Sequence, residues 1–377
     1  MAAAEIVQLL RETIGLDPDS IGQPTVERAI QERQAASGLG DVRSYAARVQ
    51  TSKDELQALV ETVVVPETWF FRDPGAFDAL SAVVRHGALP MATEPLRLLS
   101  VPSASGEEPY SMAMALLDAG VPSARFQVDA MDVSRVALER AAAAEYGRNS
   151  FRGGGTLGRD HHFETTPGGR RVCERVRRQV RFRHGNLLAL PFVAGRDQFD
   201  IIFCRNLLIY FDRATQDRAI DGLGALLKPD GLLFVGSSEG GLALSHGYVS
   251  ARLPMAFAFR RPQPARAPRP SPVRALPVAM TAPPAPKPQP QPPIASAPPA
   301  IDLAVPSADA FCQLGVEHDA HGSLDEAEAC YRKALYLDPR HQDAVTRLAL
   351  LVERRGAEAE AKVLWNRARR LAGGNPR

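Results

Sequence analysis

The sequence predicts an α/β protein in which a parallel sheet lies between an N-terminal helical domain and a C-terminal pair of helical repeats. Three observations support this prediction. An apolar run at residues 96–101 stops at the small residues SASG and resumes as a helix, which is a strand–loop–helix pattern. Strand-like and helix-like segments then alternate as far as residue 235. Beyond residue 302, a helical template of about 34 residues fits twice.

The composition supports large folded domains, because 45% of the 377 residues are hydrophobic. The longest apolar stretches, such as residues 199–211, are interrupted by charged and polar side chains, so no membrane span is predicted. No basic leader precedes the first apolar stretch, and the four cysteines lack a CxxC pair. We therefore expect a cytoplasmic protein without a disulfide framework or zinc site. Adjacent His161 and His162 lack a second ligand pair, and we expect no metal there.

Residues 1–64 are predicted to form an all-helical domain. Asp41 is placed to cap one helix, and Ser52 with Glu55 forms a capping-box pattern before the next helix. Several arginines lie on or near the polar faces of these helices. They fit either a solvated surface or a docking face, and the sequence leaves both interpretations open.

The central domain is predicted to span residues 65–260 and opens with the connector PETWFFRDPGAF, which carries unusually large side chains. We expect Trp69, Phe70 and Phe71 to enter the core rather than to form a recognition site. Arg72 stands beside them, and burying its charge is costly unless the guanidinium meets an anion. The connector is therefore predicted to carry one charged side chain toward a ligand.

Carboxylates follow the first predicted loop and the second predicted strand. Glu107 and Glu108 lie in the first turn of a helix, where the dipole favours negative charge. Asp132 follows a strand over 125–131 and precedes a helix over 134–146, so it could bind ribose hydroxyls or cap that helix. Small-residue loops also occur without a ligand. The prediction of a nucleotide-like ligand therefore depends on the loop and the acid together.

Residues 149–184 interrupt the alternation, and their turn-rich sequence predicts a small antiparallel β insertion that includes residues 180–183. Seven arginines fall between residues 170 and 183, against a single acid, Glu174. Such a patch favours an anionic partner. Charge alone leaves nucleic acid, acidic lipid and acidic protein open.

Polar side chains stand at or just past the ends of the later predicted strands: Asn186, Arg205, Asn206 and Tyr210. A ligand would lie across this carboxyl edge of the sheet. Tyr210 also fits a second interpretation, a core tyrosine whose hydroxyl is hydrogen-bonded. Residues 248–260 are predicted to close the domain as an edge strand.

A linker is predicted over residues 261–301, which contain 15 prolines, no aromatic residue and no acid and cannot bury a core. Residues 302–377 match the template of tetratricopeptide repeats at Phe311, Leu314, Gly315, Ala327, Tyr331, Ala334 and Pro339, and again at Val345, Leu348, Ala349, Ala361, Trp365 and Ala368. Two copies fall short of the usual three, so residues 364–370 could cap the pair or pack on another part. The repeats predict a protein-binding groove, with a stabilising appendage as the alternative.

Six motifs occur in an order and spacing that resemble the chemotaxis receptor methyltransferase (CheR) family: PETWFFRDPGAF, SASGEEPYS, the strand end at Asp132, GNLL, FDIIFCRNLLIYFD and LLKPDGLLFVGSSE. The resemblance implies a Rossmann-like class I methyltransferase fold, with S-adenosylmethionine (SAM) as donor, S-adenosylhomocysteine as product and no metal. It implies glutamate side chains on the cytoplasmic helices of methyl-accepting chemoreceptors as acceptors. The repeats after a proline-rich linker are similar to a subset of this family that includes surface-sensing systems.

The resemblance also implies individual roles. Glu107 would meet the methionine portion of the donor, Asp132 the ribose hydroxyls, and Asn186 with Leu187 the adenine end. The same cleft would be completed by Arg205, Asn206, Thr68 and Arg72.

Arg72 and Tyr210 would lie nearest the reacting centre. A glutamate is already ionised at neutral pH, so methyl transfer needs alignment rather than a strong base. We therefore expect Arg72 to hold the acceptor carboxylate and Tyr210 to orient it.

Two prolines depart from the family pattern. Pro102 has no N–H to donate, so close contacts in the loop would rest on later residues, and Pro66 replaces an asparagine of the connector. These departures leave room for a regulatory or scaffold protein that binds SAM or its product and recruits a partner through the repeats. A nucleic-acid methyltransferase is a further alternative, but no base-recognition motif accompanies the arginines.

We expect two partners. One is the cytoplasmic domain of a chemoreceptor, whose acidic helices would complement the basic helical domain and the insertion. The other is an unidentified protein at the repeat groove. We expect no nucleic acid and no direct membrane insertion.

Overall fold

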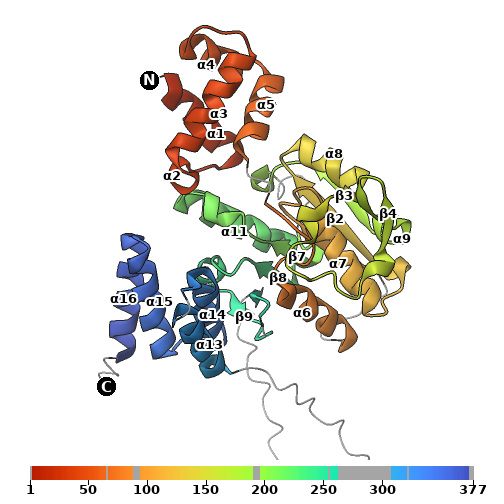
Figure 1. The fold of residues 1–377 in the computed structure, drawn as a ribbon, viewed down its shortest axis with the longest axis vertical. Helices are drawn as coiled ribbons and strands as arrows, with labels where there is room; N and C mark the ends of the chain where they lie inside the picture. The colour runs from red at the N-terminus through yellow and green to blue at the C-terminus, as the bar shows by residue number, and fades with distance from the viewer. Residues whose placement is uncertain are drawn as a thin grey trace, which may run out of the picture.

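The structure is a computed structural model that describes residues 2–64, 67–87, 94–189, 196–253, 255–261, 307–320 and 322–372. Pro66 and the predicted linker, apart from Arg261, lie outside these ranges. Figure 1 shows an N-terminal group of helices, a central sheet with its helices, and a C-terminal group of helices. No helix within the described ranges is long and apolar enough to cross a membrane.

The N-terminal part is helical, as predicted: α1 (Ala2–Ile14), α2 (Pro18–Ile21), α3 (Gln23–Ala36), α4 (Val42–Thr51) and α5 (Lys53–Val63). Both predicted caps are confirmed. Asp41 accepts hydrogen bonds from the first-turn backbone of α4, and Ser52 Oγ accepts one from Glu55 N. The Glu55 carboxylate binds Arg33 and the Tyr45 hydroxyl, so it joins α3, α4 and α5.

The main sheet has the order β6-β2-β1-β7-β8-β10-β9. Its strands are β1 (Leu96–Ser100), β2 (Phe126–Asp132), β6 (Val180–His184), β7 (Phe199–Cys204), β8 (Leu227–Val235), β9 (Val249–Ser250) and β10 (Ala258–Arg260). The first five strands in this order pair in parallel, whereas β10 is antiparallel to both neighbours. The chain runs from β1 to β2 on one side and later to β7 on the other. A crevice therefore opens at the carboxyl end of β1.

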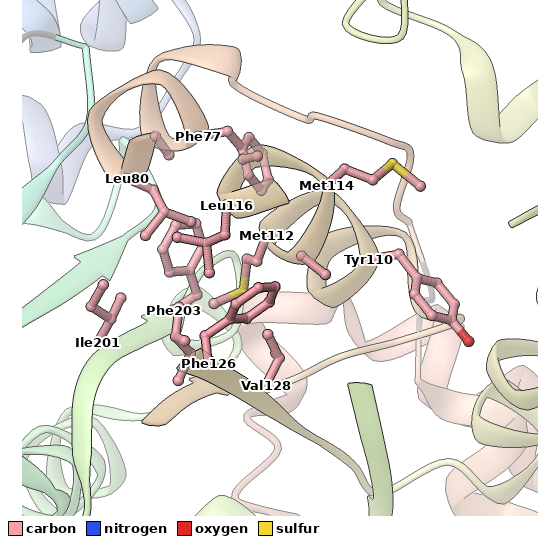
Figure 2. Close-up of a cluster of buried hydrophobic side chains, with 14 of the residues drawn as sticks. Phe77, Leu80, Tyr110, Met112, Met114, Leu116, Phe126, Val128, Ile201 and Phe203 are labelled. Carbon is pink, nitrogen blue, oxygen red and sulfur yellow. The ribbon is translucent and has the colours of Figure 1, made fainter. Parts of the chain in front are cut away.

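The core has two layers because successive strand residues point to opposite faces. Leu98 and Ile201 share one buried cluster with α6 (Pro74–Arg85) and α7 (Glu107–Asp118). Leu99 and Ile202 share the other cluster with α11 (Arg213–Leu226). Figure 2 shows side chains of the first cluster: Phe77, Leu80, Met112, Leu116, Phe126, Val128 and Phe203. Truncating one of its rings, as in Phe203→Ala, is expected to cost about 3–5 kcal/mol of stability.

Two local predictions are wrong. Residues 180–183 belong to β6, which pairs in parallel with β2 in the main sheet rather than with the insertion. Alternation of apolar and charged residues predicts a half-buried strand but does not identify its neighbour. The helix predicted over 134–146 ends early: α8 spans Arg135–Ala143, Ala144 has φ +55°, and Glu145–Tyr146 forms β3.

The predicted small antiparallel sheet exists, with two strands inside the predicted insertion and a third, β3, just before it. Its order is β3-β5-β4, with β4 at Phe163–Thr166 and β5 at Gly169–Val172. The short helix α9 (Glu174–Arg177) follows. The arginines of residues 170–183 are therefore divided among β5, α9 and the edge of the main sheet.

The C-terminal part contains α13 (Ala308–Ala320), α14 (Leu324–Leu337), α15 (Gln342–Arg354) and α16 (Glu358–Ala372). Gly315 fits the repeat template, because a Cβ there would lie 2.6 Å from the Tyr331 ring. Leu364 and Ala368 lie in the core of the repeats. The contact with the central domain is instead made by α14, through Tyr336.

Candidate functional site

A cavity opens at the carboxyl ends of β1, β2 and β7 and encloses about 850 Å³, its open mouth included. A mainly apolar pocket with a few polar groups, placed at this edge of a parallel sheet, suits a small molecule or cofactor. Its wall is mainly apolar, and it is lined by several of the predicted site residues: Asp132, Asn186, Leu187, Asn206 and Tyr210. The remaining predicted residues lie outside this lining: Thr68, Arg72, Glu107 and Arg205.

The loop after β1 forms one wall of the cavity. Pro102 follows a cis peptide bond and lines the cavity rather than filling it. Because Pro102 has no N–H, the next residues supply the donors. Ser103 N donates to Met131 O and Ala104 N to Asp132 Oδ2, each at 2.8 Å. The residues after the proline therefore tie the loop to the end of β2.

Asp132 is the carboxylate in this wall and is 7% exposed. Its oxygens accept hydrogen bonds from Ala104 N and Ser134 N. Burial raises the pKa of the Asp132 carboxyl, and these backbone donors act against that shift. Ser134 Oγ caps α8 by accepting from Ala137 N at 2.9 Å. The second lone pair of each Asp132 oxygen is suited to ligand hydroxyl groups.

The N-terminal domain forms a further wall that the sequence did not predict. Side chains of α1, the following turn, α2 and the end of α5 line the cavity: Ile14, Leu16, Ile21 and Val64. Asn186 Nδ2 donates to Thr13 O at 2.5 Å, and Asp17 N donates to Tyr210 O at 2.8 Å. The Asn186 Oδ1 atom accepts from Leu188 N at 2.9 Å. The Nδ2 end of the Asn186 amide thus joins the helical domain to the sheet, while the Oδ1 end fixes the loop after Asn186.

Glu239 organises the loop that carries Asn206 and Tyr210. Its carboxylate is 3% exposed and accepts four backbone hydrogen bonds, from Gly236, Asn206, Leu207 and Leu208, at 2.7–3.0 Å. Burial raises the pKa of this carboxyl, against the effect of the four donors. Asn206 has φ +58°, a conformation that few non-glycine residues adopt without support. This role was not predicted from the sequence, although an acid directly after GSS, four residues past the end of β8, was a signal.

Arg205 forms a buried ionic network beside the cavity. Its side chain is 2% exposed and binds Asp73 Oδ2 at 2.6 Å and Glu108 Oε2 at 3.1 Å. Its guanidinium also donates to Arg72 O at 3.0 Å. Burial raises the pKa of the Glu108 carboxyl, and the positive charge of Arg205 opposes that shift. Arg205 is thus committed to neutralising two acids and to fixing the backbone of the connector.

The connector residues and Glu107 lie outside the lining of the cavity. The Arg72 guanidinium lies 4.6 Å from the Trp69 ring and donates to Glu67 O at 2.7 Å, and Thr68 is half-buried beside it. Glu107 is buried at the start of α7, where its oxygens accept from Ser105 Oγ and Ser150 Oγ. Phe70 and Phe71 are buried, as predicted, whereas Trp69 is half-buried.

Comparisons with known proteins agree on the family. The chain matches the all-alpha domain of CheR methyltransferase over residues 2–64, the SAM-binding domain over 66–246 and a tetratricopeptide repeat over 308–341. A probable biofilm formation methyltransferase, WspC of Pseudomonas aeruginosa, is 42% identical over 96% of this chain and 97% of its own length. The chain belongs to the CheR methyltransferase family.

Other CheR relatives extend the comparison. A chemotaxis protein methyltransferase of Salmonella typhimurium is 34% identical over 62% of this chain and 82% of its own. The solved structure of PKMT2 from Rickettsia typhi in complex with AdoHcy aligns over 46% of this chain and 26% of its own, at 17% identity and a TM-score of 0.29, which supports no argument. The family and the relatives make this chain a SAM-dependent methyltransferase of the chemotaxis type.

The cavity of this CheR methyltransferase fits SAM in chemical character. It combines an apolar wall from two domains, the buried acceptor Asp132 and the polar side chain of Asn206. An apolar slot suits a purine ring, and a carboxylate at the end of the second strand suits ribose hydroxyls.

The fold brings a carboxylate, which was not predicted from the sequence, to the two adjacent histidines of the insertion. Asp118 Oδ1 lies 2.7 Å from His162 Nε2 and 3.2 Å from His161 Nε2, while Arg159 binds the other oxygen. Burial lowers the pKa of His162, and the neighbouring Asp118 opposes that shift. These hydrogen bonds and ion pairs tie the insertion to the C-terminal end of α7.

The predicted basic patch of this CheR methyltransferase, residues 170–183, has fewer arginines free of acidic partners than its sequence suggests. Four of the seven arginines lie within 4 Å of acids: Arg170 with Asp160, Arg171 with Glu145, Arg178 with Glu174 and Arg183 with Asp129. Each pair reduces the positive field that a partner would meet. Any attraction for an anionic partner therefore rests on the arginines outside these pairs.

Proposed function

We propose that this CheR methyltransferase transfers the methyl group of SAM to glutamate side chains on the cytoplasmic helices of a methyl-accepting chemoreceptor. The observation that carries the proposal is a mainly apolar cavity at the carboxyl edge of the sheet, lined by Asp132, Asn206 and Tyr210. Relatives named as chemotaxis methyltransferases support the substrate class. The products would be S-adenosylhomocysteine and glutamyl methyl esters.

In this proposal, Asp132 binds the ribose hydroxyls, and Leu187 with the Asn186 backbone contacts the adenine end. Asn206 borders the methionine portion. Glu107 and Arg205 act indirectly, because neither side chain lines the cavity and the Arg205 guanidinium is engaged by Asp73 and Glu108. Glu107 then shapes the start of α7, and Arg205 supports the connector with Thr68 and Arg72.

Bound SAM supplies an electrophilic methyl group on a sulfonium. The acceptor glutamate is ionised at neutral pH, so no residue of this chain needs to remove a proton. Arg72 would hold the carboxylate through a charge-assisted hydrogen bond, and the Tyr210 hydroxyl would fix its orientation. The apolar wall would exclude water from the nucleophile. The rate of methyl transfer is therefore expected to depend on alignment of the reacting atoms rather than on acid–base catalysis.

The test is incubation of the full chain with methyl-labelled SAM and a receptor cytoplasmic fragment, followed by base treatment. Base-labile label on the fragment is expected. Arg72→Ala and Tyr210→Phe should lower the single-turnover rate by about tenfold or more at unchanged SAM affinity, whereas Arg85→Ala, on an exposed position of α6, should not. SAM binding without transfer to any fragment would support the regulatory-protein alternative instead.

The remaining proposals concern partners and location. The receptor helix would dock through residues 170–183 and the helical domain, an unidentified protein would occupy the repeat groove, and the chain would work in the cytoplasm. Arg181→Glu should lower activity on the fragment more than Arg85→Glu, and the difference should shrink as ionic strength rises. Activity that is indifferent to salt would contradict this docking mode.

A further inference from the structure

A buried tyrosine, Tyr336, joins the repeat pair to the central domain. The Tyr336 hydroxyl donates to Ala258 O at 2.9 Å and accepts from Ala258 N at 3.2 Å. Its ring lies 5.1 Å from Phe257 and 5.7 Å from Phe259, and it is 6% exposed. Tyr336 belongs to the same buried cluster as α11. The last turn of α14 is thus built into the core of the methyltransferase domain rather than resting on its surface.

A second contact runs from the repeats to the start of α6. Met255 packs against the core of the repeats. Its backbone has φ +59°, and Phe257 beyond it has φ +47°. A Cβ on Gly75 would lie 2.3 Å from Met255 Cβ and 2.6 Å from Met255 O, so the two chain segments are in direct contact. Figure 1 shows α6 and the repeat helices α13 and α14, with β9 drawn between them.

Gly75 follows the connector segment that contains Arg72. Phe71 and Asp73, on either side of Arg72, both have φ +55°, a conformation that persists in such residues only when the surroundings enforce it. Ser111 Oγ accepts from Phe71 N at 2.9 Å, and Arg205 binds Asp73 and the Arg72 carbonyl. These contacts hold the segment from α7 and β7. Met255, which packs against the core of the repeats, contacts this segment at Gly75.

We propose that Tyr336 and Met255 are positioning residues for methyl transfer, through which the docked repeat pair holds the segment 71–75 and hence Arg72. The proposal rests on the proposed role of Arg72 in the reaction. A partner that bound the repeats and shifted α14 would change the rate of transfer, while the cavity at the carboxyl ends of the strands would bind SAM as before.

The experiment compares full-length Tyr336→Phe and Met255→Ala with Tyr331→Phe, which alters a phenol buried within the repeats. The first two variants are expected to lower the single-turnover rate at saturating SAM about three- to tenfold, with the SAM Kd unchanged. Tyr331→Phe should leave both values unchanged. Unchanged rates in Tyr336→Phe and Met255→Ala would overturn the proposal.

Arg72→Ala supplies the double-mutant test. If the repeats act through Arg72, adding Met255→Ala to Arg72→Ala should cause no further loss, and an additive loss would overturn the proposal. Amide hydrogen exchange gives a readout that does not need activity. Exchange at Phe71 and Ala76 should accelerate in Tyr336→Phe and Met255→Ala, and unchanged exchange would also overturn the proposal. If Arg72→Ala keeps the wild-type rate, the proposed role of Arg72 fails while exchange still decides whether the repeats hold the segment.

Discussion

The two helical parts contact the α/β domain in different places and by different means. The N-terminal domain meets the carboxyl ends of the strands, where its apolar side chains line the cavity and its backbone pairs with the Tyr210 loop. The repeat pair meets β10 on the antiparallel side of the sheet, through the aromatic contacts of Tyr336. A helical part at the carboxyl edge can touch a ligand directly, whereas one at the antiparallel side can act only through the loops it supports.

Within this comparison the largest effect is expected at Glu239, and it tests whether the helical domain alone holds the Tyr210 loop. Glu239→Gln replaces an acceptor oxygen by an NH2 group among four backbone donors. We expect a loss of about 2–4 kcal/mol in the free energy of unfolding, together with weaker SAM binding, measured by denaturant titration and calorimetry. Glu353→Gln, at an exposed acid that accepts from Trp365 Nε1, is the control. If Glu239→Gln leaves the free energy of unfolding and SAM binding nearly unchanged, the contacts with the helical domain are sufficient to hold the Tyr210 loop.

A smaller effect compares the two helical parts directly. Leu16→Ala removes buried apolar surface from the cavity wall and should raise the SAM Kd about three- to tenfold. Leu337→Ala, beside the buried cluster on the repeat side, should leave the SAM Kd unchanged although it weakens docking. Calorimetric titration of both full-length variants decides the point. If both variants raise the SAM Kd equally, the repeat pair affects SAM binding as strongly as the helical domain does.

The smallest effect lies away from both helical parts, at His162. Its pKa in the folded state is below the ordinary value of 6.5, so the native state binds fewer protons than the unfolded state between that lowered pKa and 6.5. Stability should therefore fall as pH drops below 6.5. His162→Gln should flatten this part of the Tm-against-pH curve without changing SAM affinity at neutral pH.

His161→Gln is the matched control for His162, since His161 is exposed. It should leave the curve near that of the wild type. Below pH 3.8 a further loss of stability is expected in the wild type, because, against the effect of its burial, hydrogen bonds from His162, His161 and Arg159 lower the pKa of Asp118. This loss should be smaller in His162→Gln, which removes the strongest of these contacts. If Tm still falls below pH 6.5 in His162→Gln, groups other than His162 cause that fall.

Local sequence signals were reliable where the chemistry is local. Asp41 and Ser52 cap their helices because the acceptor and the N–H groups it binds lie within three residues. Gly315 faces the Tyr331 ring because repeat geometry fixes that spacing. Asp132 was predicted at the end of a strand beside a loop, and the structure has it at that position, in the wall of a cavity.

The misses share one cause, which is that their partners lie far along the chain. Residues 180–183 were predicted as a strand, but only the folded sheet selects β2 as its neighbour. Arg205 and Glu239 can be recognised in the sequence as charged residues near strand ends. Their burial, and the backbone groups they hold, follow from segments up to about 130 residues away.

The sequence by itself determined the α/β class, the family and the residue types at the carboxyl edge, because hydrophobic period and short motifs depend on neighbours in the chain. Only the tertiary structure decided that the helical domain closes the cavity, that Arg205 supports the connector instead of lining the cavity, and that a repeat tyrosine enters the domain core. These features depend on which surfaces meet when apolar faces are buried, and no local pattern encodes that choice.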